Sequence, residues 1–153
     1  MRISDILQVD AIEADLKAKG KQDVLTELVD TLMRVETGLD RDEVVKVLLE
    51  REKLGSTGIG DGIAIPHGKL KGLQELIISF GRSQNGVEFD SMDGKPVNLF
   101  FLLIAPEESI GIHLKTLARI SKLLKNSMVR QKLCEASTAE DVFSIISEEE
   151  GKL

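Results

Sequence analysis

An almost unbroken apolar run at residues 97–105, interrupted only by Asn98, constrains the fold more than any other feature of the chain. Both faces of a strand with this composition are apolar, which is typical of a strand at the centre of a sheet that helices cover on both sides. The run is much shorter than the roughly 20 apolar residues that a membrane-spanning helix needs. We therefore expect residues 97–105 to form the central strand of an α/β domain.

Helices and further strands are predicted on both sides of this strand in the sequence. Apolar residues at helical spacing predict helices over residues 21–36, 41–53 and 110–125, with two more helices after residue 126. Leu76, Ile78 and Phe80 alternate as in a half-buried strand, and the turn residues 92–96 predict a hairpin that makes part of the sheet antiparallel. This interleaved order predicts an α/β fold: a three-layer sandwich with a mixed parallel and antiparallel sheet and helices on both faces.

The last predicted helix carries a signal at each end. Ser137 followed by Glu140 matches a capping box, so we expect the helix to begin there. Glu148, Glu149 and Glu150 place negative charge at its C-terminal end, where the helix dipole is also negative. We therefore expect the end of this helix to fray.

Composition argues against several classes of function. The 153 residues favour one domain, spanning residues 1–153, and the 42% hydrophobic and 30% charged residues are ordinary for a globular protein. A net charge of −6 and only 3% aromatic residues argue against nucleic acid as a partner. The first residues lack the apolar segment of a secretory signal, and the single Cys134 cannot form an internal disulfide. We expect a cytoplasmic protein without membrane insertion.

The candidate reactive residue is His67, at the end of a glycine-rich stretch, residues 56–69. Pro66 restricts the backbone directly before the histidine, and Gly68, directly after it, has no side chain to block an approaching group. We therefore expect the imidazole of His67 to be held rigidly and left open to a partner.

The residues before His67 have the composition of an anion-binding loop. Gly58, Gly60 and Gly62 alternate there, which suits a chain that turns tightly and directs backbone N–H groups at an anion. The hydroxyl groups of Ser56 and Thr57 add further donors. We therefore predict a phosphate-binding loop in which Ser56 and Thr57 take part.

Common nucleotide-binding motifs do not fit this stretch. The dinucleotide fingerprint would need a glycine at Ile63, and a Walker loop would need a serine or threonine after Lys69. A hydrolase with Ser56 as nucleophile and His67 as base would need a Gly-x-Ser-x-Gly elbow, which is absent. A histidine beside apolar residues can also be purely structural. Local sequence alone leaves a reactive and a structural histidine as alternatives.

Two further residues are expected near His67. Arg51 lies at the end of a predicted helix, directly before the glycine-rich stretch, where its guanidinium can hold a phosphate with two hydrogen bonds. His113 falls at the start of the helix that follows the central strand, where N-terminal N–H groups attract a phosphate. The simpler alternatives are a solvated arginine and a surface histidine. The two histidines and one distant cysteine are too few for a zinc site.

The sequence of residues 54–69 is LGSTGIGDGIAIPHGK, and it resembles the active-site signature of the fructose/mannitol-type (type 2) enzyme IIA domains of the bacterial phosphotransferase system. Residues 1–7 and 112–114 also resemble that family, so the likeness extends over nearly the whole chain. Within the family, the free-standing opening and the lack of a fused partner are most similar to the nitrogen-regulatory branch.

The resemblance implies a phosphoryl carrier, rather than a free-standing enzyme, that accepts a phosphoryl group on Nε2 of His67. It also implies a phosphorylated HPr-like phosphocarrier as the donor, docking on a shallow apolar surface, and no cofactor or metal. Arg51, His113, Ser56 and Thr57 are then the expected phosphate-binding groups, because phosphoryl transfer mainly requires positioning and stabilisation of charge.

The fate of the phosphate separates three interpretations. In the regulatory branch, which we expect here, the phosphorylation state controls binding to target proteins. In sugar-transporting members of the fructose/mannitol type, the phosphate passes to a cysteine of a IIB domain. The third interpretation is a regulatory binding module whose histidine never turns over.

Overall fold

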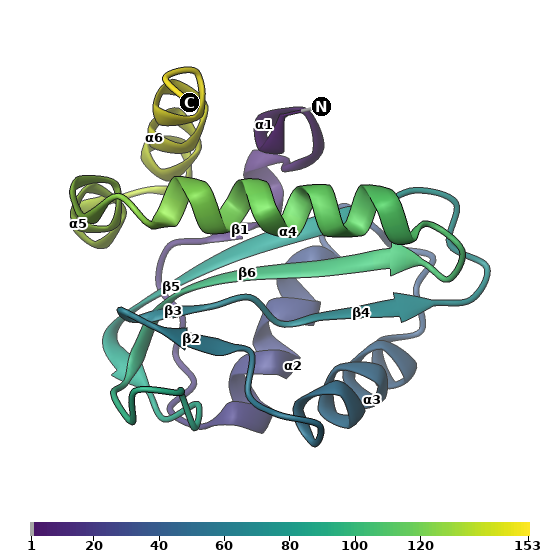
Figure 1. The fold of residues 1–153 in the computed structure, drawn as a ribbon. Coiled ribbons are helices and arrows are strands. Elements are labelled where there is room, and N and C mark those ends of the chain that lie inside the picture. Colours follow the sequence, from purple (N-terminus) through teal and green to yellow (C-terminus); the bar gives the residue numbers. More distant parts are fainter. Residues whose placement is uncertain (1) are drawn as a thin grey trace.

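A mixed sheet forms the centre of the structure, which is a computed structural model. The structure describes residues 2–153, so Met1, the first residue of the stretch 1–7 that resembles the family, lies outside the described residues. The strand order is β1-β5-β6-β3-β2, and β4 also pairs with β6 (Figure 1). The strands are β1 (Ile12–Glu13), β2 (Gly58–Gly60), β3 (Ile63–Ala64), β4 (His67–Leu70), β5 (Ile77–Val87) and β6 (Val97–Pro106). Parallel pairs (β1–β5, β3–β6, β4–β6) and antiparallel pairs (β2–β3, β5–β6) both occur, which confirms the predicted mixed sheet.

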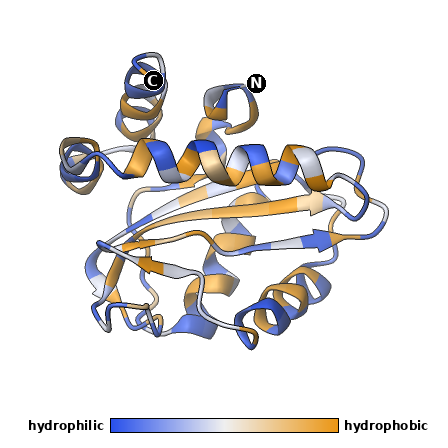
Figure 2. Ribbon diagram, in the orientation of Figure 1, coloured by the Kyte–Doolittle hydropathy of each residue, from blue (hydrophilic) through white to orange (hydrophobic). Residues whose placement is uncertain are grey.

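β6 is the central strand that the apolar run predicted. It pairs with β5 along one edge and with β3 and β4 along the other. Phe100 and Leu102 point into one hydrophobic cluster, whereas Phe101 and Leu103 point into the other. The strand is therefore apolar along almost its whole length (Figure 2), because both of its faces are covered.

Helices form a layer on each face of the sheet, which confirms the three-layer α/β fold. One layer contains α2 (Lys21–Leu32) and α3 (Arg41–Glu52). The other contains α1 (Ile3–Ile6), α4 (Ile110–Leu124), α5 (Ser127–Glu135) and α6 (Ala139–Glu150). In Figure 1, α4 lies along the sheet and begins at the end where β6 finishes. Within residues 2–153, no helix has the length and apolar character needed to cross a membrane.

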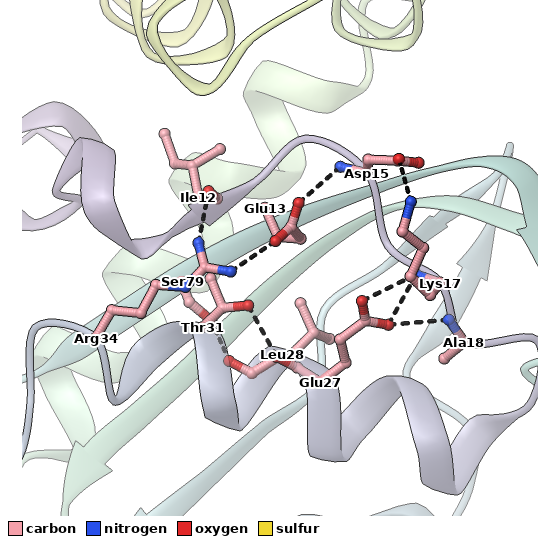
Figure 3. A network of polar contacts seen from close by, with 10 residues as sticks. All are labelled: Ile12, Glu13, Asp15, Lys17, Ala18, Glu27, Leu28, Thr31, Arg34 and Ser79. Atoms are coloured by element: carbon pink, nitrogen blue, oxygen red, sulfur yellow. Dashed lines mark hydrogen bonds and ion pairs between the residues drawn. The ribbon is translucent and has the colours of Figure 1, made fainter.

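The helix predicted over residues 21–36 and the strand predicted around residues 76–80 differ from the structure. The helix predicted over residues 21–36 ends at Leu32, after which the chain continues in turns. β5 is longer than predicted and is not half-buried, because α2 covers the face that we expected to be solvated. Ser79 on that face is completely buried, and its hydroxyl donates to the carbonyl of Leu28 in α2 at 3.1 Å (Figure 3).

Polar contacts fix α2 and the chain before it against the edge of the sheet (Figure 3). Arg34, after α2, donates to the carboxylate of Glu13 in β1 at 2.6 Å. The carboxylate of Glu27 accepts hydrogen bonds from the backbone N–H groups of residues 17–18 at 2.9–3.0 Å. These contacts fix the position of the start of α2 and therefore of Lys21. From this position Lys21 forms an ion pair with Glu52 of α3.

The last helix begins one residue later than its capping pattern predicted. Thr138, not Ser137, is the N-cap, and its hydroxyl accepts from the backbone N–H of Asp141 at 3.1 Å. Ser137 and Thr138 both carry a hydroxyl that can cap a helix, so the pattern could not distinguish these neighbours. The error is one of position and does not change the element.

The end of the last helix does not fray, contrary to our prediction. α6 continues to Glu150, whose side chain is only 1% exposed. The Glu150 carboxylate accepts from the backbone N–H of Ser4 at 3.1 Å and from Nε of Arg119 at 2.6 Å. The carboxylate therefore lies at the N-terminus of α1, where it is favoured by the unpaired N–H groups of that helix. Tertiary contacts outweigh the local repulsion on which the prediction was based.

Candidate functional site

The glycine-rich stretch folds into short strands instead of the predicted phosphate-binding loop. β2 and β3 form a hairpin, and its turn contains Asp61 and Gly62 with φ angles of 57° and 77°. Positive φ angles are accessible to glycine without steric cost, so Gly62 serves this turn. β3 and β4 then follow one another along β6, separated by Ile65 and Pro66.

The hairpin lies away from His67. His67 is opposite Leu103 of β6, whereas Ile63, beside the hairpin turn, is opposite Leu99. Four residues of extended strand separate these two positions, which corresponds to roughly 13 Å. The glycines of the hairpin therefore cannot surround a phosphate on His67, and the predicted loop of N–H donors is wrong.

The hydroxyl groups of Ser56 and Thr57 are occupied by other protein groups. Ser56 Oγ donates to the carbonyl of Phe89 and accepts from the N–H of Gly58, both at 3.0 Å. Thr57 is 4% exposed, and its hydroxyl donates to the carboxylate of Glu52. Neither residue lines the cavity that contains His67. The geometry thus places these two side chains away from the cavity of His67 and does not support the phosphate contact that we expected.

His67 is the first residue of β4, and the backbone just before it orients its ring. Nδ1 of His67 lies 2.7 Å from the carbonyl oxygen of Ile65. Because a carbonyl oxygen only accepts, Nδ1 carries the proton of the neutral ring and Nε2 keeps its lone pair. Burial lowers the pKa of His67 below its ordinary value and outweighs the hydrogen bond to Ile65, which acts in the opposite direction. The ring is therefore neutral near pH 7, with Nε2 as its nucleophilic atom.

His113 lies in the first turn of α4, beside His67. The two ring centroids are 5.2 Å apart, and the ring planes are inclined by 56°. The His113 side chain is only 6% exposed, and within residues 2–153 its Nδ1 has no hydrogen-bond partner. Burial lowers the pKa of His113, and the neighbouring His67 and Lys69 lower it further. The structure thus brings the two histidines together as neutral rings.

Arg51 lies in the last turn of α3 and lines the same cavity as both histidines. Its Nη1 donates to the carbonyl of Gly55 at 3.0 Å. Within the described residues, this is the only hydrogen bond that the guanidinium makes to the protein. The Nε and Nη2 donors are therefore free to bind an anion. The positive charge of Arg51 also contributes, after burial, to the lowered pKa of His67.

The shared cavity is shallow and has a volume of about 410 Å³. Gly68 forms part of its wall, but for a different reason than the sequence suggested. A Cβ atom at Gly68 would lie 2.7 Å from Cγ1 of Val47 in α3, so the glycine permits close packing of α3 against β4. This packing brings the end of α3, and with it Arg51, next to His67.

Exposed apolar side chains lie on the wall of the cavity and on the helix that contributes His113 to it. Leu54, which lines it, is 84% exposed. Ile110 and Leu114 of α4 are 55% and 58% exposed and lie four residues apart, on one face of the helix that carries His113. Exposed apolar side chains gathered around a polar site are typical of a protein interaction surface.

The sequence analysis missed Glu52, whose carboxylate fixes the segment that follows Arg51 by bonding to Thr57. The Glu52 side chain is 3% exposed, and its carboxylate accepts from the backbone N–H of Thr57 at 3.1 Å. Nζ of Lys21 lies 3.1 Å from the same carboxylate and 4.8 Å from the centroid of the Phe89 ring. No local signal marks Glu52, because its ion pair depends on a lysine thirty-one positions earlier in the chain.

Lys69 was also missed. It follows His67 by two residues in β4, so both side chains lie on the same face of the strand, and Lys69 lines the cavity as well. Within residues 2–153 it forms no salt bridge. Strand alternation would have found Lys69 if residues 67–70 had been predicted as a strand.

Comparison with known proteins identifies relatives over nearly the whole length of the chain. The family model described as "Phosphoenolpyruvate-dependent sugar phosphotransferase system, EIIA 2" matches residues 5–149. The chain is 42% identical over 147 residues to the "Nitrogen regulatory protein" of Bradyrhizobium diazoefficiens. The aligned residues make up 96% of this chain and 95% of that protein.

Two further relatives extend this comparison. The "PTS system fructose-specific EIIABC component" of Bacillus subtilis is 37% identical over 148 residues, which is 97% of this chain but only 23% of that longer protein. The crystal structure of nitrogen regulatory protein IIA-Ntr from Neisseria meningitidis superimposes with a TM-score of 0.88 at 38% identity, covering 94% of this chain and 98% of that chain. Similar sequences therefore make up almost the whole of some relatives and only part of a longer one.

Proposed function

Because the chain belongs to the EIIA 2 family of the phosphoenolpyruvate-dependent sugar phosphotransferase system, we propose that it is a phosphoryl carrier whose His67 accepts a phosphoryl group. The orientation of His67 is the observation that carries the proposal. Nδ1 lies 2.7 Å from the Ile65 carbonyl, so Nε2 is the free nitrogen of a residue that shares its cavity with Arg51 and His113. The proposed donor is the phosphohistidine of an HPr-like phosphocarrier.

In the transfer step, the lone pair on Nε2 of His67 forms a bond to phosphorus while the bond between phosphorus and the donor's histidine nitrogen breaks. The donor nitrogen takes back the electron pair of the broken bond. The proton on Nδ1 of His67 stays in place, so the step needs no base. The ring becomes positively charged on phosphorylation, and the Ile65 carbonyl, 2.7 Å from Nδ1, stabilises that charge.

Arg51 and His113 stabilise the phosphoryl oxygens during transfer. Charge in a loose phosphoryl transition state is spread over three oxygens that point away from the line of transfer. Arg51 offers its Nε and Nη2 donors from the end of α3, and His113 offers one ring N–H from the start of α4. These groups act from fixed secondary structure, which favours stabilisation of the transition state without reorganisation.

The exposed apolar side chains around the cavity form the docking surface for the phosphocarrier. Leu54 lines the cavity from the chain after α3, whereas Ile110 and Leu114 lie on α4, the helix that contributes His113 to the cavity. A partner that covers these side chains would exclude water from His67 and so strengthen the electrostatic contacts to the phosphate. The polar contacts to the phosphate would then lie near the centre of the interface, inside an apolar rim.

A regulatory role of the nitrogen type is supported by the similarity to nitrogen regulatory proteins that are matched over nearly their whole length. In this role, the phosphorylation state of His67 would control binding to target proteins. The second candidate is a sugar-transport IIA component that passes the phosphate to a IIB cysteine, which the similarity to the fructose-specific EIIABC component favours. A binding module without phosphoryl turnover is the candidate of a different class.

The proposal is tested by intact mass after incubation with a purified phosphocarrier cascade. One phosphate that is lost in mild acid but stable in base is expected on the wild type, and none with ATP alone. Addition of a purified IIB protein then distinguishes the two roles, because only a transport component would lose its phosphate to the IIB cysteine.

The matched control for this test is His113→Ala, which removes the other imidazole of the pair. His113→Ala should still accept one phosphate, whereas His67→Ala should accept none. Label that survives mild acid, or that persists in a folded His67→Ala variant, would contradict the assignment. No label on the wild type would leave the binding module as the remaining candidate.

A further inference from the structure

His67 and Arg51 are both connected to one buried carboxylate, that of Glu52. The Glu52 side chain is only 3% exposed, and its carboxylate lies 3.1 Å from Nζ of Lys21. The carboxylate accepts hydrogen bonds from the backbone N–H of Thr57, at 3.1 Å, and from the hydroxyl of the same residue. It therefore joins the end of α3 to the residue that directly precedes β2.

One connection leads from Glu52 to the ring of His67. The carbonyl of Thr57 accepts from the backbone N–H of Ile65 at 3.1 Å. The carbonyl of Ile65 in turn lies 2.7 Å from Nδ1 of His67 and determines which ring nitrogen is free. Successive hydrogen bonds thus run from the Glu52 carboxylate to the imidazole. A shift of Thr57 would move the carbonyl that orients His67.

A second connection leads from Glu52 to Arg51. Nη1 of Arg51 donates to the carbonyl of Gly55 at 3.0 Å. Gly55 lies within the segment 52–57, which the Glu52 carboxylate closes by its bonds to Thr57. Within this segment, the backbone carbonyl of Glu52 also accepts from the N–H of Gly55 at 3.1 Å. These bonds fix the backbone around Gly55, and therefore the carbonyl that holds the guanidinium of Arg51.

We propose that Glu52 is a positioning residue for phosphoryl transfer, whose carboxylate fixes both the nucleophilic ring of His67 and the guanidinium of Arg51. Glu52 does not line the cavity of His67, so it acts through the backbone and does not touch the phosphate. A nucleophile and a donor that are fixed before the phosphocarrier arrives need no reorganisation during the reaction. The role in transfer, but not the orientation of the two side chains, rests on the proposed phosphorylation of His67.

The orientation is tested in the unphosphorylated protein with Glu52→Gln, which keeps the size of the side chain but removes its charge. The amide has one acceptor oxygen in place of two, so it cannot accept from both the N–H and the hydroxyl of Thr57 in the same geometry. Long-range ¹⁵N–¹H spectra above pH 7 should then show both ring nitrogens of His67 shifted towards the average of two tautomers. The wild type should show a protonated Nδ1 alone.

Single-turnover transfer from the phosphocarrier measures the effect on the reaction. Glu52→Gln should lower the maximal rate about 10- to 100-fold, the upper value being the effect of a displacement of roughly 1 Å. The phosphocarrier concentration that gives half of the maximal rate should not change, because the exposed apolar side chains of the docking surface remain.

Thr57→Val removes only the hydroxyl and leaves the charge of Glu52 in place. Because the bond from the backbone N–H of residue 57 remains, this variant should show a smaller change in the His67 spectrum. Its transfer rate should fall about fivefold, the effect of one hydrogen bond.

Glu150→Gln is the matched control. Glu150 is also a buried carboxylate with a cationic partner, Arg119, and it accepts from the backbone N–H of Ser4 at 3.1 Å. It belongs to α6, in the helical layer on the other face of the sheet from α3. Glu150→Gln should therefore lose stability, as Glu52→Gln does, but keep the transfer rate and the His67 tautomer of the wild type.

The outcomes separate positioning from a purely structural role. A single protonated Nδ1 of His67 in folded Glu52→Gln, or a transfer rate equal to that of Glu150→Gln, overturns the proposal. If Glu52→Gln does not fold, a wild-type rate and tautomer in Thr57→Val overturn it instead. A wild type that accepts no phosphate overturns the proposed function, and the spectra of the variants still decide whether Glu52 orients His67.

Discussion

His67 and His113 have ring centroids only 5.2 Å apart, yet their surroundings differ in kind. His67 lies on a strand, and the carbonyl of Ile65, two residues before it, determines which ring nitrogen carries the proton. His113 lies on a helix, is almost completely buried, and within residues 2–153 has no partner that determines its tautomer. A nucleophile needs one defined lone pair, whereas a supporting group can change its hydrogen bonds when a ligand arrives. The comparison therefore supports the proposal that His67 is the group that reacts and His113 a group that supports the transfer.

The largest expected effect is the loss of all phosphorylation in His67→Ala. The reason is that the variant lacks the only proposed nucleophile, while the cavity and its other residues remain. The free energy of unfolding should fall by about 1 kcal/mol, the value of one hydrogen bond, because His67 is half-buried. Intact mass measures the phosphorylation and urea unfolding measures the stability. A folded variant that still gains phosphate would reverse the roles assigned to the two histidines.

The second expected effect is a slower transfer in His113→Ala, with one phosphate per protein at the end point. Loss of one donor to a developing oxyanion costs roughly 2.7 to 4 kcal/mol, or about 100- to 1,000-fold in rate. Single-turnover transfer from the phosphocarrier, followed by mass at short times, measures this rate. A rate within about threefold of the wild type, which is less than 1 kcal/mol, would mean that His113 does not touch the transferring group.

A smaller decrease in rate is expected for Arg51→Lys, which keeps the charge but loses the planar pair of donors. One charge-assisted hydrogen bond, at about 1.5 kcal/mol, corresponds to roughly tenfold in rate. Glu50→Gln is a suitable control, because Glu50 lines the same cavity but is not assigned a contact to the phosphate. If Arg51→Lys transfers phosphate as fast as the wild type, the charge of residue 51 and not the guanidinium geometry determines the rate. If Glu50→Gln slows the reaction as much as Arg51→Lys does, the effect is not specific to the guanidinium.

The smallest expected effect is the pH dependence of stability. Burial lowers the pKa of both histidines below 6.5, so the unfolded chain takes up protons more readily than the folded protein. Their contribution to stability is complete above pH 6.5 and is lost as the pH falls below that value towards the pKa of the folded state. Urea midpoints just below pH 6.5 should fall less steeply in His67→Ala and in His113→Ala than in the wild type. Equal slopes in all three proteins would contradict this prediction.

Much of the fold could be predicted because its signals are local. The apolar run that became β6 and the helical spacing of α3 and α4 were sufficient to predict a covered mixed sheet. β1 and β3 were not predictable, because each contains only two residues and is a strand only through its pairing with β5 or β6. The same limit explains why the glycine-rich stretch was mistaken for a loop.

The candidate site also has a part that could be predicted from the sequence and a part that could not. Arg51, His67 and His113 were expected near one another because their positions relative to helices and strands were visible in the sequence, and the structure places all three on one cavity. The hydrogen-bond partners of the Ser56 and Thr57 hydroxyls could not be predicted from the sequence. Thr57 bonds to Glu52, whose other partner, Lys21, is brought there by the packing of α2. Hydrogen bonds between distant segments therefore decided which hydroxyls are free.

The tautomer of His67 tests the central claim most directly. Long-range ¹⁵N–¹H spectra of the protein above pH 7 should show a protonated Nδ1 and an unprotonated Nε2 for His67, because Nδ1 bonds to the Ile65 carbonyl at 2.7 Å. After phosphorylation, coupling to ³¹P should appear on Nε2, while Nδ1 keeps its proton. A proton on Nε2 in the unphosphorylated protein, or phosphorus bound to Nδ1, would contradict the assignment of His67 as a nucleophile oriented by its own backbone.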